Sequence, residues 1–185
     1  AIFVAFIAVV SMFTGNIGAL TARETSRVLA YSTVANMGYV LATLVVLSNV
    51  NYLYLAFAGA LMQIIVNAVG KASFFTSIKV DGASTPLMYL LALSFIGLPP
   101  LMGFWSKFFI LTSLVGAGFI WLAFLIIVNS AISIPYYVRV ARSLARPTFP
   151  SRVTTIAAVA SAVMLITVVP PNWFIDVASY LIGGV

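Results

Sequence analysis

Long apolar segments, each about the length of a membrane span and nearly free of charge, make up most of this chain. A helix needs about 20 predominantly apolar residues to cross the hydrocarbon core of a bilayer. Because lipid offers no hydrogen-bond partners, the backbone of such a segment must pair internally, as a helix does. We therefore predict an all-α, polytopic transmembrane helix bundle, with spans at residues 1–20, 28–47, 52–79, 86–113, 119–138 and 153–169.

The composition supports a membrane protein and narrows its chemistry. Hydrophobic residues make up 63% of the chain and charged residues 6%, against roughly 25% charged residues in a soluble domain. Cysteine and histidine are absent, so ordinary thiolate and imidazole ligation is excluded. We expect no cofactor and no metal in this chain. The net charge of +6 is better explained by loop charges facing anionic lipids than by a nucleic-acid partner.

The two ends of the chain carry their own signals. Ala1 lies inside an apolar segment without a preceding Met or basic region, so we expect no signal peptide and a chain that is part of something larger. We interpret residues 1–185 as one membrane domain. Residues 172–185 form a tail whose apolar members recur at helical spacing, which is typical of an interfacial helix: Trp173, Phe174, Val177, Tyr180 and Leu181.

The fourth apolar segment is interrupted and then carries a cation. The helix-breaking residues are Gly97, Pro99, Pro100 and Gly103. Lys107 follows within the same segment, although a lysine at the centre of a membrane helix costs about 2.5 to 3.5 kcal/mol on insertion scales. Intramembrane lysines usually face a bundle interior or a wet cavity, so the combination indicates an ion-handling site. The alternative is that Lys107 extends its ammonium to an interface.

Polar residues in three other segments each share one helix face: Ser32, Asn36, Tyr39 and Thr43; Gln63, Asn67 and Lys71; and Asn129, Ser133 and Tyr136. We expect these faces to contact protein rather than lipid. Polar stripes of this kind hold membrane helices together, and beside lysines they can equally order water along an ion path. Lys71 lies near the middle of a long helix, which makes it a second candidate for a buried cation.

The distribution of basic residues bears on the number of crossings. If residues 86–113 cross once, all the basic connectors fall on one side of the membrane; if they cross twice, only the connector with four arginines is certainly on the inner side. Basic connectors concentrate on the inner side. Charge alone therefore favours one crossing and six spans.

Three motifs resemble one family. Residues 27–39 are similar to the [KR]-R-x-[LI]-A-Y-S-S-[IV]-x-H-x-G-Y signature of the antiporter-like subunits of respiratory complex I, and residues 15–20 to the G-N-x-x-A-L before it. Residues 97–108 resemble G-[IL]-P-P-x-x-G-F-x-x-K-F of the NuoN-type subunit, the counterpart of mitochondrial NADH dehydrogenase subunit 2. Residues 67–75 resemble H-A-x-x-K-A-x-x-F of the NuoL-type and Mrp antiporter subunits.

This resemblance implies a fold and a function. Family members have two inverted repeats, each with a broken helix; this chain would be the second repeat, the C-terminal half, with residues 86–98 as a separate short helix before the broken one and seven spans in all. It would be a proton-translocating subunit of NADH:quinone oxidoreductase without a redox site of its own. Its partners would be other membrane-arm subunits, a companion chain or missing segment with the first repeat, and lipids. Its membrane would be the mitochondrial inner membrane or a prokaryotic plasma membrane.

The resemblance also assigns roles to residues. Lys107 and Lys71 would relay protons, along a hydrated axis that begins at Arg27. Side chains that would wet this axis are Ser32, Asn36, Tyr39, Gln63, Asn67, Asn129 and Ser133. Ser26 stands where relatives often carry the relay lysine, and Asn36 and Asn67 where they often carry histidine. Because serine and asparagine do not titrate and arginine does not release its proton, the path would depend on the two lysines.

Two other functions fit the same residues. One is a cation/proton antiporter module of the Mrp or membrane-hydrogenase kind, against which the Pro99–Pro100 pair counts. The other is a structural membrane subunit that has lost pumping, which Ser26, Asn36 and Asn67 would explain. A subunit of a close relative of complex I, such as F420H2 dehydrogenase, would have the same proton-translocating function.

Overall fold

Helices account for nearly all of the structure, a computed structural model that describes residues 1–80, 82–147, 152–165 and 172–181. In chain order they are α1 (Ile2–Thr21), α2 (Thr25–Thr43) with its 3₁₀ extension η1 (Leu44–Ser48), α3 (Val50–Lys79), α4 (Thr85–Ile96), α5 (Met102–Gly116), α6 (Ile120–Leu144), α7 (Arg152–Leu165) and α8 (Asn172–Leu181). Two short strands, β1 (Ala83–Ser84) and β2 (Ala145–Arg146), complete the described elements. The all-α prediction is confirmed.

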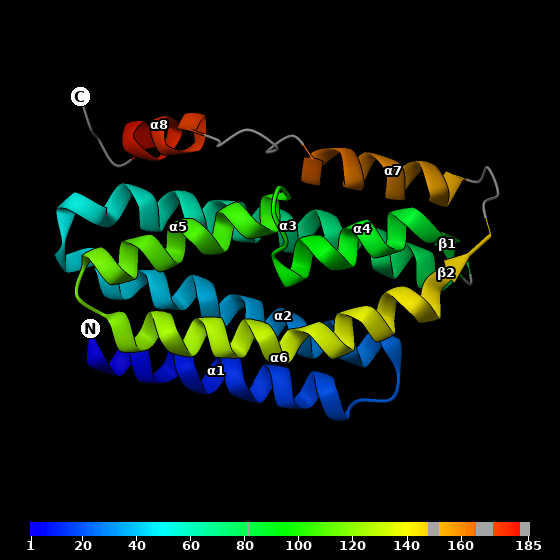
Figure 1. Cartoon of the computed structure of the whole chain (residues 1–185), viewed down its shortest axis with the longest axis horizontal. Coiled ribbons are helices and arrows are strands. Elements are labelled where there is room, and N and C mark those ends of the chain that lie inside the picture. Colours follow the sequence, from blue (N-terminus) through cyan, green and yellow to red (C-terminus); the bar gives the residue numbers. More distant parts are fainter. Residues whose placement is uncertain (81, 148–151, 166–171, 182–185) are drawn as a thin grey trace.

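Four helical segments are long and apolar enough to cross a membrane: α1, α2 with η1, α3 and α6. They contain 20, 24, 30 and 25 residues, which at about 1.5 Å per residue gives each a length of about 30 Å or more. Figure 1 shows them side by side along the long axis of the molecule. The sixth expected span, residues 153–169, is described only as far as Leu165, within α7.

The interrupted segment forms one crossing. α4 has 12 residues and α5 has 15, or about 18 and 22 Å, so neither reaches across a bilayer alone. In Figure 1, α4 runs from the end of the bundle that holds β1 to the middle, and α5 continues from the middle to the opposite end. The expected break inside the segment after residue 98 is therefore wrong, because residues 102–116 form one unbroken helix; the arrangement favours six spans over seven, and the number of spans stays a prediction. The break lies between α4 and α5, because Gly97 ends α4 in a left-handed conformation with φ of 94°.

The basic connectors lie at one end of the bundle. β1 and β2 pair in parallel, Ala83 opposite Ala145 and Ser84 opposite Arg146, which joins the α3–α4 connector to the connector after α6. Arg139 of α6 donates hydrogen bonds to the carbonyls of Ala19, Leu20 and Ala22 at 2.9 to 3.2 Å, and so caps the end of α1. The single crossing of α4 and α5 and the one-sided distribution of basic residues agree.

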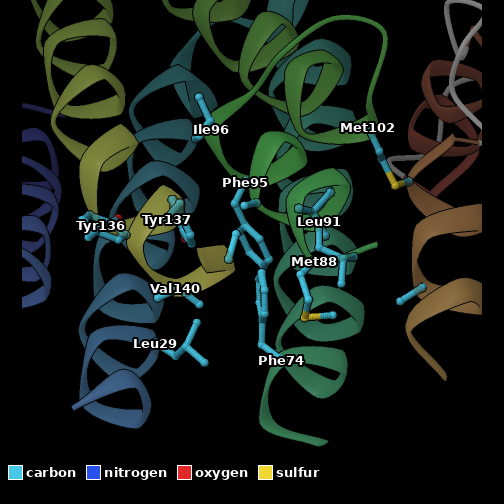
Figure 2. Packing of buried hydrophobic residues seen from close by; sticks show 14 of the residues in the cluster. Leu29, Phe74, Met88, Leu91, Phe95, Ile96, Met102, Tyr136, Tyr137 and Val140 are labelled. Carbon is cyan, nitrogen blue, oxygen red and sulfur yellow. The ribbon is translucent and has the colours of Figure 1, made fainter. Parts of the chain in front are cut away.

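Small residues allow the helices to approach closely. A side chain at Gly15 of α1 would meet the backbone of Ala35 of α2, with the Cα of Ala35 only 2.9 Å from the added Cβ. Such contacts are typical of membrane helices. Around α4, aromatic rings fill the core: Figure 2 shows Phe95 between Tyr137 of α6 and Phe74 of α3. The two lysines discussed next lie beside this aromatic group.

α8 forms within the expected tail. Trp173, Val177 and Tyr180 are exposed on it, whereas Ala178 is buried. Residues 182–185 lie outside the described part of the chain. The interfacial position of residues 172–185, and the interpretation of residues 1–185 as one membrane domain, stay predictions.

Candidate functional site

Lys107 is buried in α5, with 7% of its surface exposed. Its Nζ donates hydrogen bonds to the carbonyls of Phe95 at 2.8 Å and Ile96 at 2.9 Å, and to Ser130 Oγ at 2.8 Å. The side chain therefore points into the bundle and does not extend to an interface. Three acceptors match the three hydrogens of an ammonium group.

The prolines explain why these two carbonyls are available. In a continuous helix, the carbonyl of Phe95 would pair with the amide of residue 99 and that of Ile96 with the amide of residue 100. Those residues are Pro99 and Pro100, which have no amide hydrogen. Lys107 supplies the missing donors. It also places a positive charge at the negative end of the α4 dipole.

The loop geometry brings α5 back against α4. The amides of Gly97 and Leu98 both pair with the carbonyl of Leu93, at 3.0 and 3.1 Å, which closes the helix end. Gly103, in the first turn of α5, lies against the carbonyl of Ser94, so that a side chain there would collide with backbone. The contact between Gly103 and Ser94 keeps Lys107, one turn further along α5, next to the C-terminal end of α4.

Lys71 is buried in α3, with 6% of its surface exposed. Its Nζ donates to the carbonyl of Leu29 at 2.5 Å and to Ser32 Oγ, both from α2. Two aromatic rings face the same nitrogen, with centroids at 5.3 Å for Phe95 and 5.8 Å for Tyr137. Both distances are within the range in which a ring attracts a cation.

An amide network lies between the two lysines. Gln63 Nε2 donates to Asn36 Oδ1 at 2.8 Å, and Asn36 Nδ2 donates to the Tyr137 hydroxyl at 3.0 Å and to Asn67 Oδ1 at 3.5 Å. Ser106, the residue before Lys107, donates to Gln63 Oε1 at 2.6 Å. The network thus joins α2, α3, α5 and α6 and ends one residue from Lys107.

A second polar group connects α1, α2 and α6. Asn16 Nδ2 donates to the carbonyl of Asn129 at 2.7 Å and to its Oδ1, and the Tyr136 hydroxyl donates to Asn16 Oδ1 at 2.6 Å. The Tyr39 hydroxyl donates to Asn129 Oδ1 at 3.2 Å, and the Tyr39 ring centroid lies 5.5 Å from Lys107 Nζ. Asn129 Nδ2 has no partner among the described residues. Buried amides are rarely unpaired, which sets Asn129 apart within this group.

A cavity of about 220 Å³ adjoins Lys107 between α5 and α6. Lys107 and Ser130 are the polar residues on its wall, and the remaining walls are apolar apart from the backbone of Gly97. Phe108 and Ile127 line it and are partly exposed on the outside of the bundle. At the level of the helix break, the cavity therefore lies between Lys107 and the exterior of the bundle.

Most of the predicted site residues come together, and two do not. Arg27 lies at the start of α2, where its Nε pairs with Glu24 Oε2 at 3.2 Å and its side chain is largely exposed. Arg27 lies outside the polar network because the first turn of α2 is at the end of the bundle and not in its core. Ser133 donates to the carbonyl of Ser130 on its own helix at 2.6 Å and makes no described bond to either lysine.

The sequence reasoning missed several members of the site: Asn16, Phe95, Ile96, Ser106, Ser130 and Tyr137. Phe95 and Ile96 had a readable signal, since each stands four residues before a proline. Asn16 had another, as an isolated amide in an apolar segment. Ser106 and Ser130 had none, because serines are common in membrane helices and their partners come from distant segments.

An interrupted helix, two buried lysines and a polar network inside a polytopic bundle define a class of membrane protein that handles ions within the bilayer. Residues 1–133 match the model of the NADH:quinone oxidoreductase/Mrp antiporter transmembrane family. The chain belongs to this family.

Individual relatives point to one branch. Subunit N of the NADH-quinone oxidoreductase of Wolbachia sp. subsp. Brugia malayi is 32% identical over 157 residues, covering 75% of this chain and 32% of the relative. The F(420)H(2) dehydrogenase subunit N of Methanosarcina mazei is 33% identical, covering 74% of this chain and 32% of the relative. NADH-ubiquinone oxidoreductase chain 2 of Paracentrotus lividus is 27% identical, covering 97% and 53%. The resemblance to NuoN-type subunits is confirmed.

Solved structures share the fold. A chain of the Mrp complex from Dietzia sp. DQ12-45-1b superposes with a TM-score of 0.76 at 14% identity, covering 94% of this chain and 46% of that one. A chain of respiratory complex I from Thermus thermophilus with bound aureothin gives 0.67 at 24% identity, covering 94% and 44%. The chain spans about a third of the length of the bacterial relative and less than half of these two structural neighbours.

Proposed function

We propose that this chain is a proton-translocating part of the membrane arm of an NADH:quinone oxidoreductase, and that Lys71 and Lys107 carry the protons. The observation that supports this most is the placement of Lys107, whose Nζ contacts the open end of α4 in the middle of an interrupted crossing. Desolvation disfavours a buried ammonium, whereas the carbonyls and the helix dipole favour it. Such opposed terms leave a lysine able to gain or lose a proton when its surroundings shift.

The amide network between the lysines would order water and would not itself titrate. Asn36 and Gln63 hold each other at 2.8 Å, and Ser106 continues the chain toward Lys107. Amides and hydroxyls of this kind accept and donate at once, so they can orient the waters along which a proton moves. Ser32 lies on the same face of α2 as Asn36 and accepts a hydrogen bond from Lys71, so this route would begin at Ser32.

The remaining parts of the function would lie outside this chain. The chain contains neither cysteine nor histidine, so we assign it no cofactor and place the electron carriers in other subunits. The first repeat would come from a companion chain or from a further segment, beside other membrane-arm subunits and lipids. The membrane would be the mitochondrial inner membrane or a prokaryotic plasma membrane.

The test is proton transport by the assembled complex, reconstituted into liposomes, with Lys107→Ala and Lys71→Ala. We expect the number of protons moved per electron to fall in both variants while quinone reduction continues. Lys79→Ala is the matched control, because Lys79 is an exposed lysine at the end of α3, and it should leave the ratio unchanged. An undiminished ratio in both core variants would support a structural subunit, and a sodium requirement for transport would support an antiporter module.

A further inference from the structure

Phe95 contacts both lysines with different parts of the same residue. Its carbonyl accepts a hydrogen bond from Lys107 Nζ at 2.8 Å, and its ring centroid lies 5.3 Å from Lys71 Nζ. The ring is buried and stacks on Tyr137 at 4.9 Å with an interplanar angle of 16°. Phe95 lies in the last turn of α4, where Figure 2 shows its ring among the other buried aromatic residues. It therefore lies between the two lysine sites.

The carbonyl of Phe95 is sensitive to the protonation of Lys107. A lysine ammonium has three hydrogens for its three acceptors, whereas a neutral amine has only two. Ile96 keeps a second donor, since Ser130 Oγ donates to its carbonyl at 3.2 Å. The carbonyl of Phe95 has no donor other than Lys107 among the described hydrogen bonds, and Pro99 supplies no helical one. Loss of the proton turns the charge-assisted hydrogen bond to the carbonyl of Phe95 into a weaker neutral one, and no second donor supports this carbonyl among the described hydrogen bonds.

The ring of Phe95 is one of few groups that stabilise the charge on Lys71. The groups that face Lys71 Nζ are the Leu29 carbonyl and Ser32 of α2, the Tyr137 ring of α6 and Phe95 of α4. Tyr137 is the titratable group among them. The ion pair within the described residues, Arg27 with Glu24, lies at the bundle end, so no described carboxylate is bonded to Lys71.

We propose that Phe95 is a positioning residue that couples the two lysines, an inference that rests on the proposed function. When Lys107 loses its proton, it holds the last turn of α4 less tightly, and the ring of Phe95 shifts relative to Lys71. The preference of Lys71 for its charged form then changes. In the opposite direction, a proton on Lys107 holds the turn and keeps the ring in place.

A fluorination series at position 95 tests the ring without changing its shape. 4-Fluoro- and 3,4,5-trifluorophenylalanine withdraw electrons from the ring face, which weakens its attraction for a cation. In the reconstituted complex, we expect the alkaline limb of the pH profile of proton transport to move stepwise to lower pH, by about half a pH unit for the trifluoro ring. Phe95→Leu should uncouple transport further while electron transfer continues.

The same fluorinated residues at position 74 provide the control. Phe74 is buried in the same aromatic group, with its ring 5.8 Å from that of Phe95, but it has no described contact with either lysine nitrogen. Fluorination there should leave the pH profile unchanged. Equal shifts at both positions, or no shift at position 95, would overturn the coupling role. If Lys107→Ala and Lys71→Ala also leave transport intact, the proposed function itself fails; if only the Phe95 series is silent, the coupling alone fails.

Discussion

Lys107 takes over the role of two amide hydrogens that Pro99 and Pro100 cannot provide. Its ammonium pairs with the carbonyls of Phe95 and Ile96 and with Ser130, so the charge that is costly in lipid is satisfied within the protein. The sequence predicted a buried lysine beside a broken helix. It also contained the reason for the contact, since the residues four positions before each proline are the ones that Lys107 meets.

Removing one acceptor at this site should weaken the fold by a measurable amount. In Ser130→Ala, one ammonium hydrogen loses its partner, and hydrogen bonds to charged groups contribute about 1.5 to 3 kcal/mol. We expect a loss of that order in the free energy of unfolding of the purified subunit in detergent. Ser113→Ala is the control, because Ser113 is fully buried and, among the described hydrogen bonds, bonds only to the carbonyl of Ile110 on its own helix. Equal losses in both variants would show that the contact to Lys107 adds nothing.

At the scale of elements, α4 and α5 share one crossing, and the break between them depends on close backbone contact. Gly103 lies against the carbonyl of Ser94, where no side chain fits. The apolar segment at residues 86–113 and its break at Gly97 to Pro100 placed both short helices within a few residues of their ends. These signals did not decide between one crossing and two, because the number of crossings depends on how the two helices align after the turn. The resemblance implied two crossings, whereas the alignment of α4 and α5 favours one.

Gly103→Ala should separate α5 from the end of α4. Forcing a methyl group into a filled space costs about 1 to 3 kcal/mol, and here the obstacle is backbone. We expect a lower thermal midpoint and a weaker yield of assembled complex. In Gly18→Ala, by contrast, the new methyl group meets the half-exposed ring of Tyr31, which can move aside. A Gly103→Ala subunit as stable as Gly18→Ala would contradict the packing described for the break.

For the whole molecule, the arrangement of the basic connectors predicts the orientation in the membrane. The connectors after α1, α3 and α6 meet at one end, through the β1–β2 pair and the contacts of Arg139. Charge counting predicted this arrangement for a single crossing. The strand pair was not predicted, because two-residue strands carry no alternating pattern, and the polar contacts across helices could not be foreseen because each joins segments far apart in the chain.

Single cysteines test this orientation cleanly, since the chain has none of its own. We expect Lys79→Cys and Arg142→Cys to react with a membrane-impermeant maleimide from the same side of sealed vesicles. Ala117→Cys, in the connector between α5 and α6, should react from the opposite side. Labelling of Lys79→Cys and Arg142→Cys from opposite sides would restore the two-crossing topology and with it the seven-span fold.

The central claim is that Lys107 acts by exchanging a proton and does more than hold α4 in place. Lys107→Arg separates the two roles, because arginine keeps the positive charge and several hydrogen-bond donors but does not release its proton at working pH. The measurement is the proton-to-electron ratio of the assembled, reconstituted complex. We predict that Lys107→Arg assembles and reduces quinone but moves fewer protons per electron, as Lys107→Ala does. A Lys107→Arg complex that pumps at the full ratio would contradict the relay and leave Lys107 as a structural cap.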